Sequence, residues 1–338
     1  MQFNKNNMNL QERIELMINL GNYLQNNDLE WQEIKLQAYQ KNPWFTTVFT
    51  DMATKNIIDN FLQRDILEQW VKHYHLDDNV ASKNIGIVMA GNIPLVGFHD
   101  LLAAFICGHK QTIKLSSKDD VLLKFLLTQL CSWNPAVEKL ITVSELLKGC
   151  DAYIATGSNN SAMYFDQYFA KYPNIIRRNK TSVAVLTGNE TSADLEKLAA
   201  DIHLYFGLGC RNVTKLFVPK GYDFVPLIRS FDPYSYFMDQ HKYKNNYDYQ
   251  LSIMLLNNVY YMTNGNTLLM ENKEAFSAIS VVNYEYYEPG QVQTELINGS
   301  TDIQCTVGNG FIPFGMSQSP GLFSYADGAD TMQFLLSL

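Results

Sequence analysis

The chain has 338 residues, of which 46% are hydrophobic and 18% charged, and its formal net charge is −8. This composition is typical of a globular protein with two domains and excludes a disordered or repetitive chain. The acidic balance argues against nucleic acid as a partner, and the lack of any run of about 18 apolar residues argues against membrane insertion. Since the N-terminus lacks a signal-peptide core, we expect a cytoplasmic protein.

The predicted elements change type near residue 85. Before it, apolar side chains at helical spacing predict an all-helical lead-in from residue 10 to about 75. After it, short apolar runs rich in β-branched residues alternate with helical stretches. Strands are predicted at 85–90, 111–115, 152–156, 175–178 and 182–186, and helices at 98–107, 119–131, 160–171 and 192–205. This alternation predicts a doubly wound, mainly parallel α/β sheet whose ligands bind at the carboxyl ends of its strands.

A second α/β unit is predicted in the following part of the chain. The helix at 192–205 leads into the turn 206–212, and a strand at 215–219 follows. A Tyr-rich helix at 244–258 and strands at 267–271, 279–287 and 302–307 continue the unit. The expected domains are 1–188, the lead-in plus a nucleotide-binding α/β domain; 189–315, a catalytic α/β domain; and 316–338, a tail that packs on the first domain or on a partner subunit.

Cys210 is the cysteine with the most distinctive surroundings. The five cysteines are widely spaced and form no CxxC or Cys/His pattern, which indicates reduced thiols and no metal site. Cys210 lies in the glycine-containing turn 206–212, where a tight backbone leaves the sulfur and the following amides open to a ligand. We interpret it as a covalent nucleophile; the alternative is a buried cysteine after a helix-terminating glycine. The others lie in apolar stretches typical of core residues: Cys107, Cys131, Cys150 and Cys305.

Three loops that follow predicted strands carry Gly, Asn or Ser, at 91–94, 114–117 and 156–158. At the carboxyl ends of parallel strands, amides and hydroxyls near helix N-termini favour phosphate, so these loops suggest a nucleotide cofactor. Neither GxGxxG nor GxxxxGK[ST] is present. Each loop also has a structural alternative, namely a turn residue at Asn92, a solvated charge at Lys114 and a helix N-cap at Ser158.

The ordered set GNIPL, KLSS, ATGS, GLGC and PFG resembles the aldehyde dehydrogenase superfamily, and within it the acyl-CoA reductases of the bacterial luminescence (LuxC-like) type. The resemblance covers roughly residues 80–320. It implies an aldehyde dehydrogenase-like fold of two doubly wound α/β domains after the helical lead-in. It also implies an acyl-CoA substrate, a homo-oligomer, and an acyl-transferring protein as a further partner.

The resemblance assigns roles to individual positions. Cys210 becomes the acyl-accepting nucleophile, and the Asn92 side chain and the Cys210 backbone N–H become the oxyanion donors. A thiolate attacks a thioester readily, and a neutral amide stabilises the oxyanion without pairing with the thiolate. Lys114 matches the lysine that holds the adenosine ribose. The remaining expected cofactor-binding residues are Ser116, Ser117, Gly157 and Ser158.

One departure from the superfamily bears on the cofactor. Many NAD-preferring members have an acidic residue about three positions after the ribose-binding lysine, whereas this chain has Ser117 followed by Lys118. A hydroxyl and a cation tolerate a 2′-phosphate, so we expect NADP(H), with NAD(H) as the alternative.

Other departures bear on the reaction. Hydrolytic members carry a water-activating glutamate in a Leu-Glu-Leu-Gly-Gly stretch, and the stretch compared with it here, 185–190, has no acid at that place. Without that base, an acyl group on Cys210 favours exchange with a thiol or reduction by hydride. We expect Glu190 to be a helix-start charge and His203 a structural histidine, and we assign no role to the segment 313–317.

The expected activity is therefore NAD(P)H-dependent reduction of an acyl-CoA thioester to an aldehyde through an acyl group on Cys210. Two alternatives stay open at this point. The same scaffold could act as an aldehyde dehydrogenase or an acyl-phosphate reductase, or the chain could be a catalytically silent partner subunit.

Overall fold

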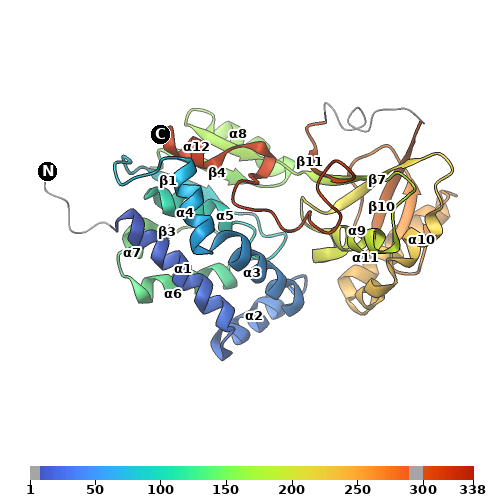
Figure 1. The fold of residues 1–338 in the computed structure, drawn as a ribbon, viewed down its shortest axis with the longest axis horizontal. Coiled ribbons are helices and arrows are strands. Elements are labelled where there is room, and N and C mark those ends of the chain that lie inside the picture. Colours follow the sequence, from blue (N-terminus) through green and yellow to red (C-terminus); the bar gives the residue numbers. More distant parts are fainter. Residues whose placement is uncertain (1–7, 289–299) are drawn as a thin grey trace, which may run out of the picture. The chain divides into compact units, whose positions relative to one another are not determined.

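The computed structural model describes residues 8–288 and 300–338 (Figure 1). The chain divides into two compact units: unit 1 comprises the chain up to Asn179 together with Pro320–Leu338, and unit 2 comprises Lys180–Ser319. The boundary thus lies between Asn179 and Lys180 and not after residue 188, because the strand predicted at 182–186 belongs to the second sheet. The last nineteen positions of the chain return to unit 1.

Unit 1 is a parallel α/β sheet covered by helices. Its helices are α1 (Leu10–Asn26), α2 (Leu29–Lys41), α3 (Thr47–Phe61), α4 (Arg64–His73), α5 (Phe98–Cys107), α6 (Val121–Trp133), α7 (Val137–Leu140), α8 (Asn159–Phe169) and α12 (Thr331–Leu336). Its strands are β1 (Asn84–Val88), β2 (Lys110–Lys114), β3 (Ile141–Val143), β4 (Ala152–Thr156) and β5 (Asn174–Arg177). The strand order is β3-β2-β1-β4-β5, and all pairs are parallel, which confirms the predicted doubly wound sheet.

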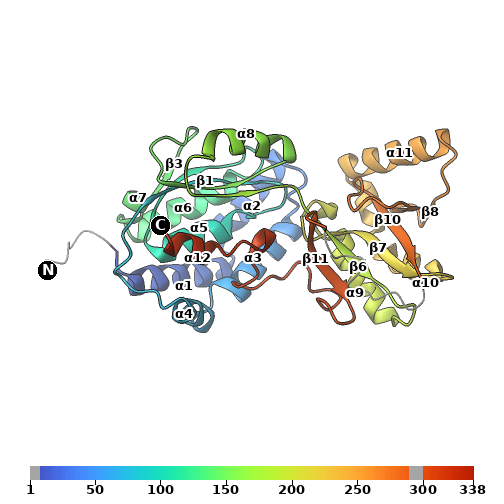
Figure 2. The same cartoon turned by 90° about the horizontal axis from the view of Figure 1, so that it is seen from above.

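This strand order creates a switch point between β1 and β4. The chain runs outward from β1 through β2 to β3, and it then returns to the other side of β1 to form β4 and β5. Helix α8 lies on the opposite side of the sheet from α1 (Figure 2). The loops after β1 and β4 therefore diverge at adjacent carboxyl ends, which is where ligands bind in open α/β sheets.

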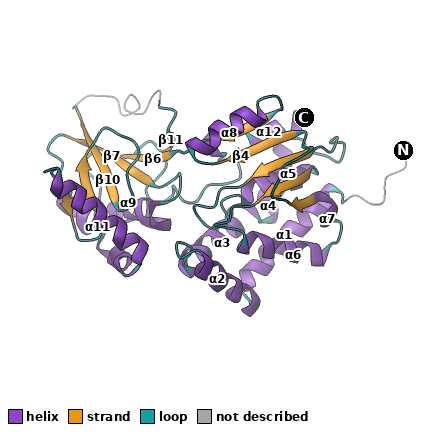
Figure 3. Ribbon diagram, turned by 180° about the vertical axis from the view of Figure 1, so that it is seen from behind, coloured by secondary structure: helices purple, strands orange, loops and turns teal. Residues whose placement is uncertain are grey.

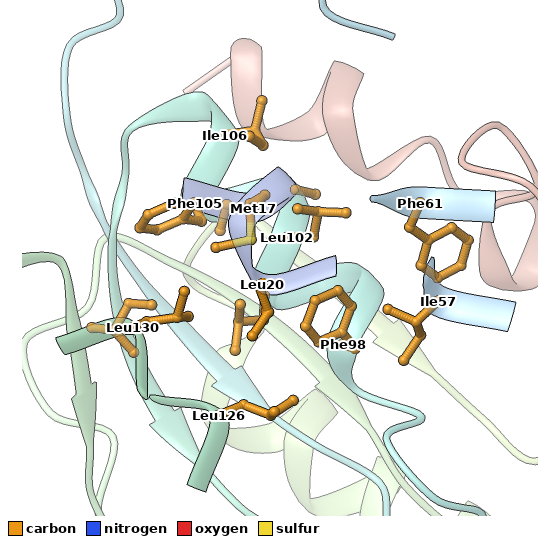
Figure 4. Packing of buried hydrophobic residues seen from close by; sticks show 14 of the residues in the cluster. Met17, Leu20, Ile57, Phe61, Phe98, Leu102, Phe105, Ile106, Leu126 and Leu130 are labelled. Atoms are coloured by element: carbon orange, nitrogen blue, oxygen red, sulfur yellow. The ribbon is translucent and has the colours of Figure 1, made fainter. Parts of the chain in front are cut away.

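The N-terminal helices form one core with α5 and α6. Helix α1 begins at an Asn9 capping box with Glu12, and its buried face includes Met17 and Leu20. Figure 4 shows these side chains among residues of α3, α5 and α6, namely Ile57, Phe61, Phe98, Leu102, Phe105, Ile106, Leu126 and Leu130. The N-terminal helices thus pack on helices α5 and α6 of unit 1.

The C-terminal tail also packs within unit 1. Helix α12 lies against α5, where the Cys107 Sγ is 3.6 Å from the Met332 Sδ. A His109 ring nitrogen is 3.0 Å from the Leu335 carbonyl oxygen. Of the tail expected at 316–338, residues 320–338 belong to unit 1, whereas residues 316–319 belong to unit 2. None of the described helices is long and apolar enough to cross a membrane.

Unit 2 is built on a six-stranded sheet in the order β11-β6-β7-β10-β9-β8. Figure 3 labels β11, β6, β7 and β10 of this sheet. Its strands are β6 (Thr181–Val185), β7 (Val213–Pro219), β8 (Met262–Thr263), β9 (Leu268–Glu271), β10 (Val281–Tyr287) and β11 (Ile303–Gly308). Its helices are α9 (Ser192–His203), α10 (Phe224–Arg229) and α11 (His241–Leu256), with 3-10 helices η1 (Leu204–Gly207) and η2 (Asp232–Asp239). Only the β8/β9 pair is antiparallel among the described pairs. The short elements α10, η2 and β8 had no clear periodicity in the sequence.

Candidate active site

Cys210 lies in the turn between η1 and β7 of unit 2. Val213, the first residue of β7, pairs with Ser182 near the start of β6, so Cys210 lies at the amino-terminal edge of this parallel sheet. The ligand edge expected for a parallel sheet is the opposite, carboxyl-terminal one. Cys210 is partly exposed. It is a free cysteine, and so are the other four.

The backbone before Cys210 turns through three consecutive left-handed residues. Tyr205, Phe206 and Gly207 have φ values of 55°, 56° and 74°. Glycine adopts this conformation freely, whereas each aromatic residue is strained in it by roughly 1–3 kcal/mol. Both aromatic side chains are buried, and the Phe206 ring lies 4.5 Å from that of Phe237. Burial of these rings therefore offsets the strain and fixes the direction in which the chain approaches Cys210.

Asn212 fastens the turn through its amide. Its Nδ2 donates to three carbonyl oxygens at the end of α9 and in η1, at 3.1 Å, 3.2 Å and 2.8 Å (Asp201, Ile202 and Leu204). Its Oδ1 accepts from the Gly209 N–H at 2.7 Å. Asn212 is fully buried and satisfies carbonyls that the helix end leaves open. The sequence does not reveal this role of Asn212, because its partners lie up to eleven positions away.

A hydroxyl and a second thiol brace the other side of the turn. The Ser182 Oγ donates to the Cys210 carbonyl oxygen at 3.0 Å and lies 3.0 Å from the Cys305 Sγ on β11. Because a hydroxyl has one proton, it accepts the hydrogen bond from the Cys305 thiol. Burial raises the pKa of Cys305, which keeps that thiol protonated and able to donate. Cys305 thus serves the turn as a hydrogen-bond donor.

His203 is structural, as expected. Both ring nitrogens have partners, the Ala199 carbonyl oxygen and the Thr267 hydroxyl, each at 2.8 Å. The ring stacks on Tyr234 with centroids 4.4 Å apart. Burial lowers the pKa of His203 to about 4, so the ring is neutral at pH 7 and supplies no positive charge to a thiolate.

Glu190 stabilises a loop at the opposite edge of the unit 2 sheet from Cys210. Its carboxylate accepts from the Thr187 N–H at 2.6 Å, the Thr187 hydroxyl at 2.8 Å and the Gly188 N–H at 3.1 Å. It follows the carboxyl end of β6, whereas Cys210 precedes β7, and strands of this length separate such edges by about 3.3 Å per residue. Glu190 therefore does not lie beside Cys210.

Asn92 lies in the loop of unit 1 that follows β1, and its side chain is exposed. The loop contains Leu95 in a left-handed conformation with φ 58°. Asp119 holds this residue, because its Oδ2 accepts the Leu95 N–H at 2.7 Å. The other oxygen, Oδ1, is buried without a hydrogen-bond partner among the described residues, and burial raises the pKa of Asp119 well above its usual range. Asp119 too was missed from the sequence.

The predicted cofactor residues of unit 1 lie at the carboxyl-terminal edge of its sheet. Lys114 ends β2 and is exposed, and Ser116 and Ser117 follow it. A Cβ on Gly91 would stand 2.5 Å from the Ser116 Oγ, so the loops after β1 and β2 pack directly on each other. The structure thereby brings Asn92, Ser116 and Ser117 into one pair of loops.

Gly157 and Ser158 follow β4 on the other side of the switch point. The Ser158 Oγ accepts the Ser161 N–H at 3.3 Å, which makes Ser158 the N-cap of α8. A Cβ on Gly157 would stand 2.9 Å from that of Ser161, so glycine permits the close approach of strand and helix. The unpaired backbone N–H groups at a helix N-terminus can bind a pyrophosphate, and Gly157 and Ser158 at the start of α8 fit such a group. No group of metal-ligating side chains occurs in the described part of the chain.

Comparison with known proteins found a matching family model and similar solved structures. A family model described as acyl-CoA reductase (LuxC) matches residues 5–226. A comparison with curated proteins returned no match. Among solved structures, the fold is similar to that of a Mycobacterium tuberculosis aldehyde dehydrogenase complexed with NAD+, with a TM-score of 0.65, 12% identity, and coverage of 92% of this chain and 76% of that one.

Two further aldehyde dehydrogenases share the fold. The enzyme KauB from Pseudomonas aeruginosa has a TM-score of 0.64 and 15% identity, with 89% of this chain and 72% of that chain covered. Aldehyde dehydrogenase 21 from Physcomitrella patens, in complex with its reaction product succinate, has a TM-score of 0.65 and 11% identity, with 89% and 74% covered. These likenesses show an aldehyde dehydrogenase-like fold of two α/β units.

Proposed function

Because this chain belongs to the LuxC family of acyl-CoA reductases, a family of oxidoreductases, we propose that it reduces an acyl-CoA thioester to an aldehyde through an acyl group on Cys210. The observation that carries the proposal is the turn around Cys210. It presents a partly exposed thiol in a backbone that Asn212 and Ser182 hold from both sides. Each of the other four thiols has a pKa raised by burial, which disfavours the reactive thiolate.

The first half-reaction is an acyl transfer to sulfur. The Cys210 thiolate attacks the thioester carbonyl carbon, the carbon–sulfur bond to coenzyme A breaks, and coenzyme A leaves as a thiolate that takes up a proton. The Asn92 amide and the Cys210 N–H donate to the oxyanion in this proposal. Loss of one such donor typically lowers the rate by about 10²–10³.

A nicotinamide cofactor, when bound, would supply the reducing equivalent for the acyl carbon as a hydride, which is a pair of electrons and one hydrogen nucleus. The carbon–sulfur bond to Cys210 then breaks, the aldehyde leaves, and the thiolate is restored. Lys114, Ser116 and Ser117 would hold the adenosine side of the cofactor, and Gly157 and Ser158 the pyrophosphate. Where NAD-preferring members carry an acidic residue, this chain has Ser117 followed by Lys118, and a hydroxyl and a cation tolerate a 2′-phosphate, which supports NADPH over NADH.

The position of Glu190 supports reduction over hydrolysis. Its carboxylate is occupied by three loop donors at the opposite edge of the sheet from Cys210. Activation of a deacylating water needs a base within hydrogen-bond reach, and Glu190 cannot supply it. An acyl group on Cys210 then persists until a thiol or a hydride removes it.

The direct test follows NADPH absorbance with acyl-CoA substrates of increasing chain length. We expect oxidation of NADPH with stoichiometric release of coenzyme A, and loss of both in Cys210→Ala. The matched control is Cys131→Ala, which removes a partly buried thiol of α6 in unit 1 and should leave the rate unchanged. Turnover of acyl-CoA that persists in Cys210→Ala would contradict the proposal. So would a protein that turns over an aldehyde or an acyl phosphate but does not turn over acyl-CoA.

A further inference from the structure

Asp201, on the last turn of α9, is the acceptor for a segment that the sequence left without a role. Its Oδ2 accepts the Gly315 N–H at 2.6 Å, and its Oδ1 accepts the Ser317 N–H at 3.0 Å and the Ser317 hydroxyl at 2.7 Å. Asp201 and Ser317 are both fully buried. Gly315 has φ 84°, which favours glycine, so this turn has a defined shape. The side chain of Asp201 therefore fixes the turn 313–317.

The main chain of the same residue fixes the nucleophile turn. The Asp201 carbonyl oxygen accepts from the Asn212 Nδ2 at 3.1 Å, and Asn212 in turn accepts from the Gly209 N–H, next to Cys210. One residue of α9 thus holds two turns, one through its side chain and one through its backbone. Both turns are therefore hydrogen-bonded to the same fully buried residue.

The chemistry of this acceptor favours a carboxylate over an amide. Three donors converge on the two oxygens, two of them backbone N–H groups that cannot rotate away. An ionised carboxylate has only acceptors and satisfies all three. An asparagine would bring an NH₂ group against at least one N–H, which leaves two donors facing each other in a buried site.

We propose that Asp201 is a positioning residue of the reaction, which holds the turn 313–317 and the Cys210 turn as one rigid group. This inference rests on the proposed function of Cys210. It deepens that function, because it names what keeps the nucleophile in its attacking position. It also gives a role to the segment 313–317, which acts through Asp201 on Cys210.

The chain offers a matched control for the test. Glu190 also accepts two backbone N–H groups and one hydroxyl, but it does so at the opposite edge of the same sheet. The variants to compare are therefore Asp201→Asn and Glu190→Gln, each of which replaces a three-donor carboxylate by an amide. Ser317→Ala is the milder variant, since it removes only the hydroxyl and keeps both backbone bonds.

We expect Asp201→Asn to lower kcat about 10- to 100-fold, because small displacements of reacting groups have effects of that size. The dissociation constant of NADPH, measured by fluorescence, should stay unchanged, because the proposed cofactor residues lie in unit 1. Ser317→Ala should lower kcat by a smaller factor, about two- to fivefold, because it removes one of the three hydrogen bonds to the Asp201 carboxylate and leaves both backbone bonds in place. Glu190→Gln should keep the wild-type kcat.

The rate at which iodoacetamide alkylates Cys210, followed by peptide mass spectrometry, provides a readout that needs no substrate. Asp201→Asn should change this rate and Glu190→Gln should not. Equal kcat and alkylation rates in Asp201→Asn and wild type would overturn the inference, as would equal losses in the Asn and Gln variants. If Asp201→Asn does not fold, an unchanged kcat in Ser317→Ala overturns it and a lowered one supports it. Absence of acyl-CoA turnover in the wild type would instead remove the proposed function, while the alkylation comparison still decides the role of Asp201.

Discussion

The turn that carries Asn92 in unit 1 and the turn that carries Cys210 in unit 2 both contain left-handed residues other than glycine, and different chemistry stabilises them. Leu95 is held by one hydrogen bond to Asp119, whose second oxygen is buried without a partner among the described residues. In unit 2, Asn212 donates through its amide nitrogen and accepts through its amide oxygen, and Asp201 accepts hydrogen bonds from three donors. Both carboxyls are buried, and burial raises the pKa of each.

The difference lies in the number of donors. Three hydrogen bonds oppose the effect of burial on the pKa of Asp201, whereas one opposes it for Asp119, whose pKa stands well above its usual range. Position 119 thus supplies one acceptor oxygen to its turn, whereas position 201 supplies two oxygens that accept three donors. The Cys210 turn is accordingly the one held by more hydrogen bonds.

The largest effect is expected for Asn212→Ala. The substitution removes the partner of three carbonyl oxygens and of the Gly209 N–H, all of them close to Cys210. A buried polar group without a partner costs about 1–3 kcal/mol, so the free energy of unfolding should fall by about 3 kcal/mol or more. Urea denaturation measures it. A loss under about 1 kcal/mol would show that the turn does not depend on Asn212.

The buried His203 should make the protein less stable in acid. The pKa of His203 in the folded protein is about 4, against 6.5 for the free group. Between these pH values the unfolded chain binds a proton at His203 and the folded chain does not. The stability that the neutral ring contributes is complete above pH 6.5 and is lost as the pH falls toward 4. The loss is about 3 kcal/mol at most, at about 1.4 kcal/mol per pH unit. Urea unfolding at several pH values should show a weaker pH dependence in His203→Asn than in wild type; equal slopes would contradict this.

The third prediction separates shape from charge in unit 1. Asp119→Leu leaves the Leu95 N–H without its acceptor and should lower the free energy of unfolding by about 1–3 kcal/mol. Asp119→Asn keeps an acceptor oxygen and should lose less. Because the folded-state pKa of Asp119 is raised, its contribution is complete below the unfolded pKa and is lost as the pH rises through the folded one. Asp119→Asn should therefore remove part of the loss of stability at higher pH. An Asn variant as unstable as the Leu variant would contradict this difference between the units.

The smallest effect is expected at Cys305. Cys305→Ser keeps a hydrogen-bond donor to the Ser182 hydroxyl, whereas Cys305→Val removes it. The Val variant should lose about 1 kcal/mol of unfolding free energy relative to the Ser variant, the usual contribution of one hydrogen bond. Thermal unfolding of both proteins checks this. A Ser variant less stable than the Val variant would show that packing, and not the hydrogen bond, is what Cys305 supplies.

The two regions also differ in how far the sequence predicts them. In unit 1, local signals sufficed for the strand at 152–156, for the N-cap at Ser158 and for the loops that carry Asn92 and Lys114. The alternation of strands and helices continues unbroken past Asn179, so the pattern cannot indicate that β6 joins a new sheet.

The residues that hold the turns were missed for a related reason. Asp201 reaches partners 114 and 116 positions away, and Asp119 reaches one 24 positions away. Amphipathic spacing reports which face of a helix is buried, but it does not report which buried polar group meets which backbone N–H. Similarly, no sequence rule predicts left-handed Tyr205 and Phe206, since their conformation depends on burial of both rings.

The central claim is that Cys210 carries the acyl group, and trapping that group tests it most directly. The protein is incubated with an acyl-CoA in the absence of any nicotinamide, and the Cys210 peptide is analysed by mass spectrometry. The account predicts one acyl adduct on this peptide, release of an equal amount of coenzyme A, and loss of the adduct when NADPH is added. Acylation at another cysteine that survives Cys210→Ala, or the absence of any adduct in a protein that still oxidises NADPH with acyl-CoA, would contradict it.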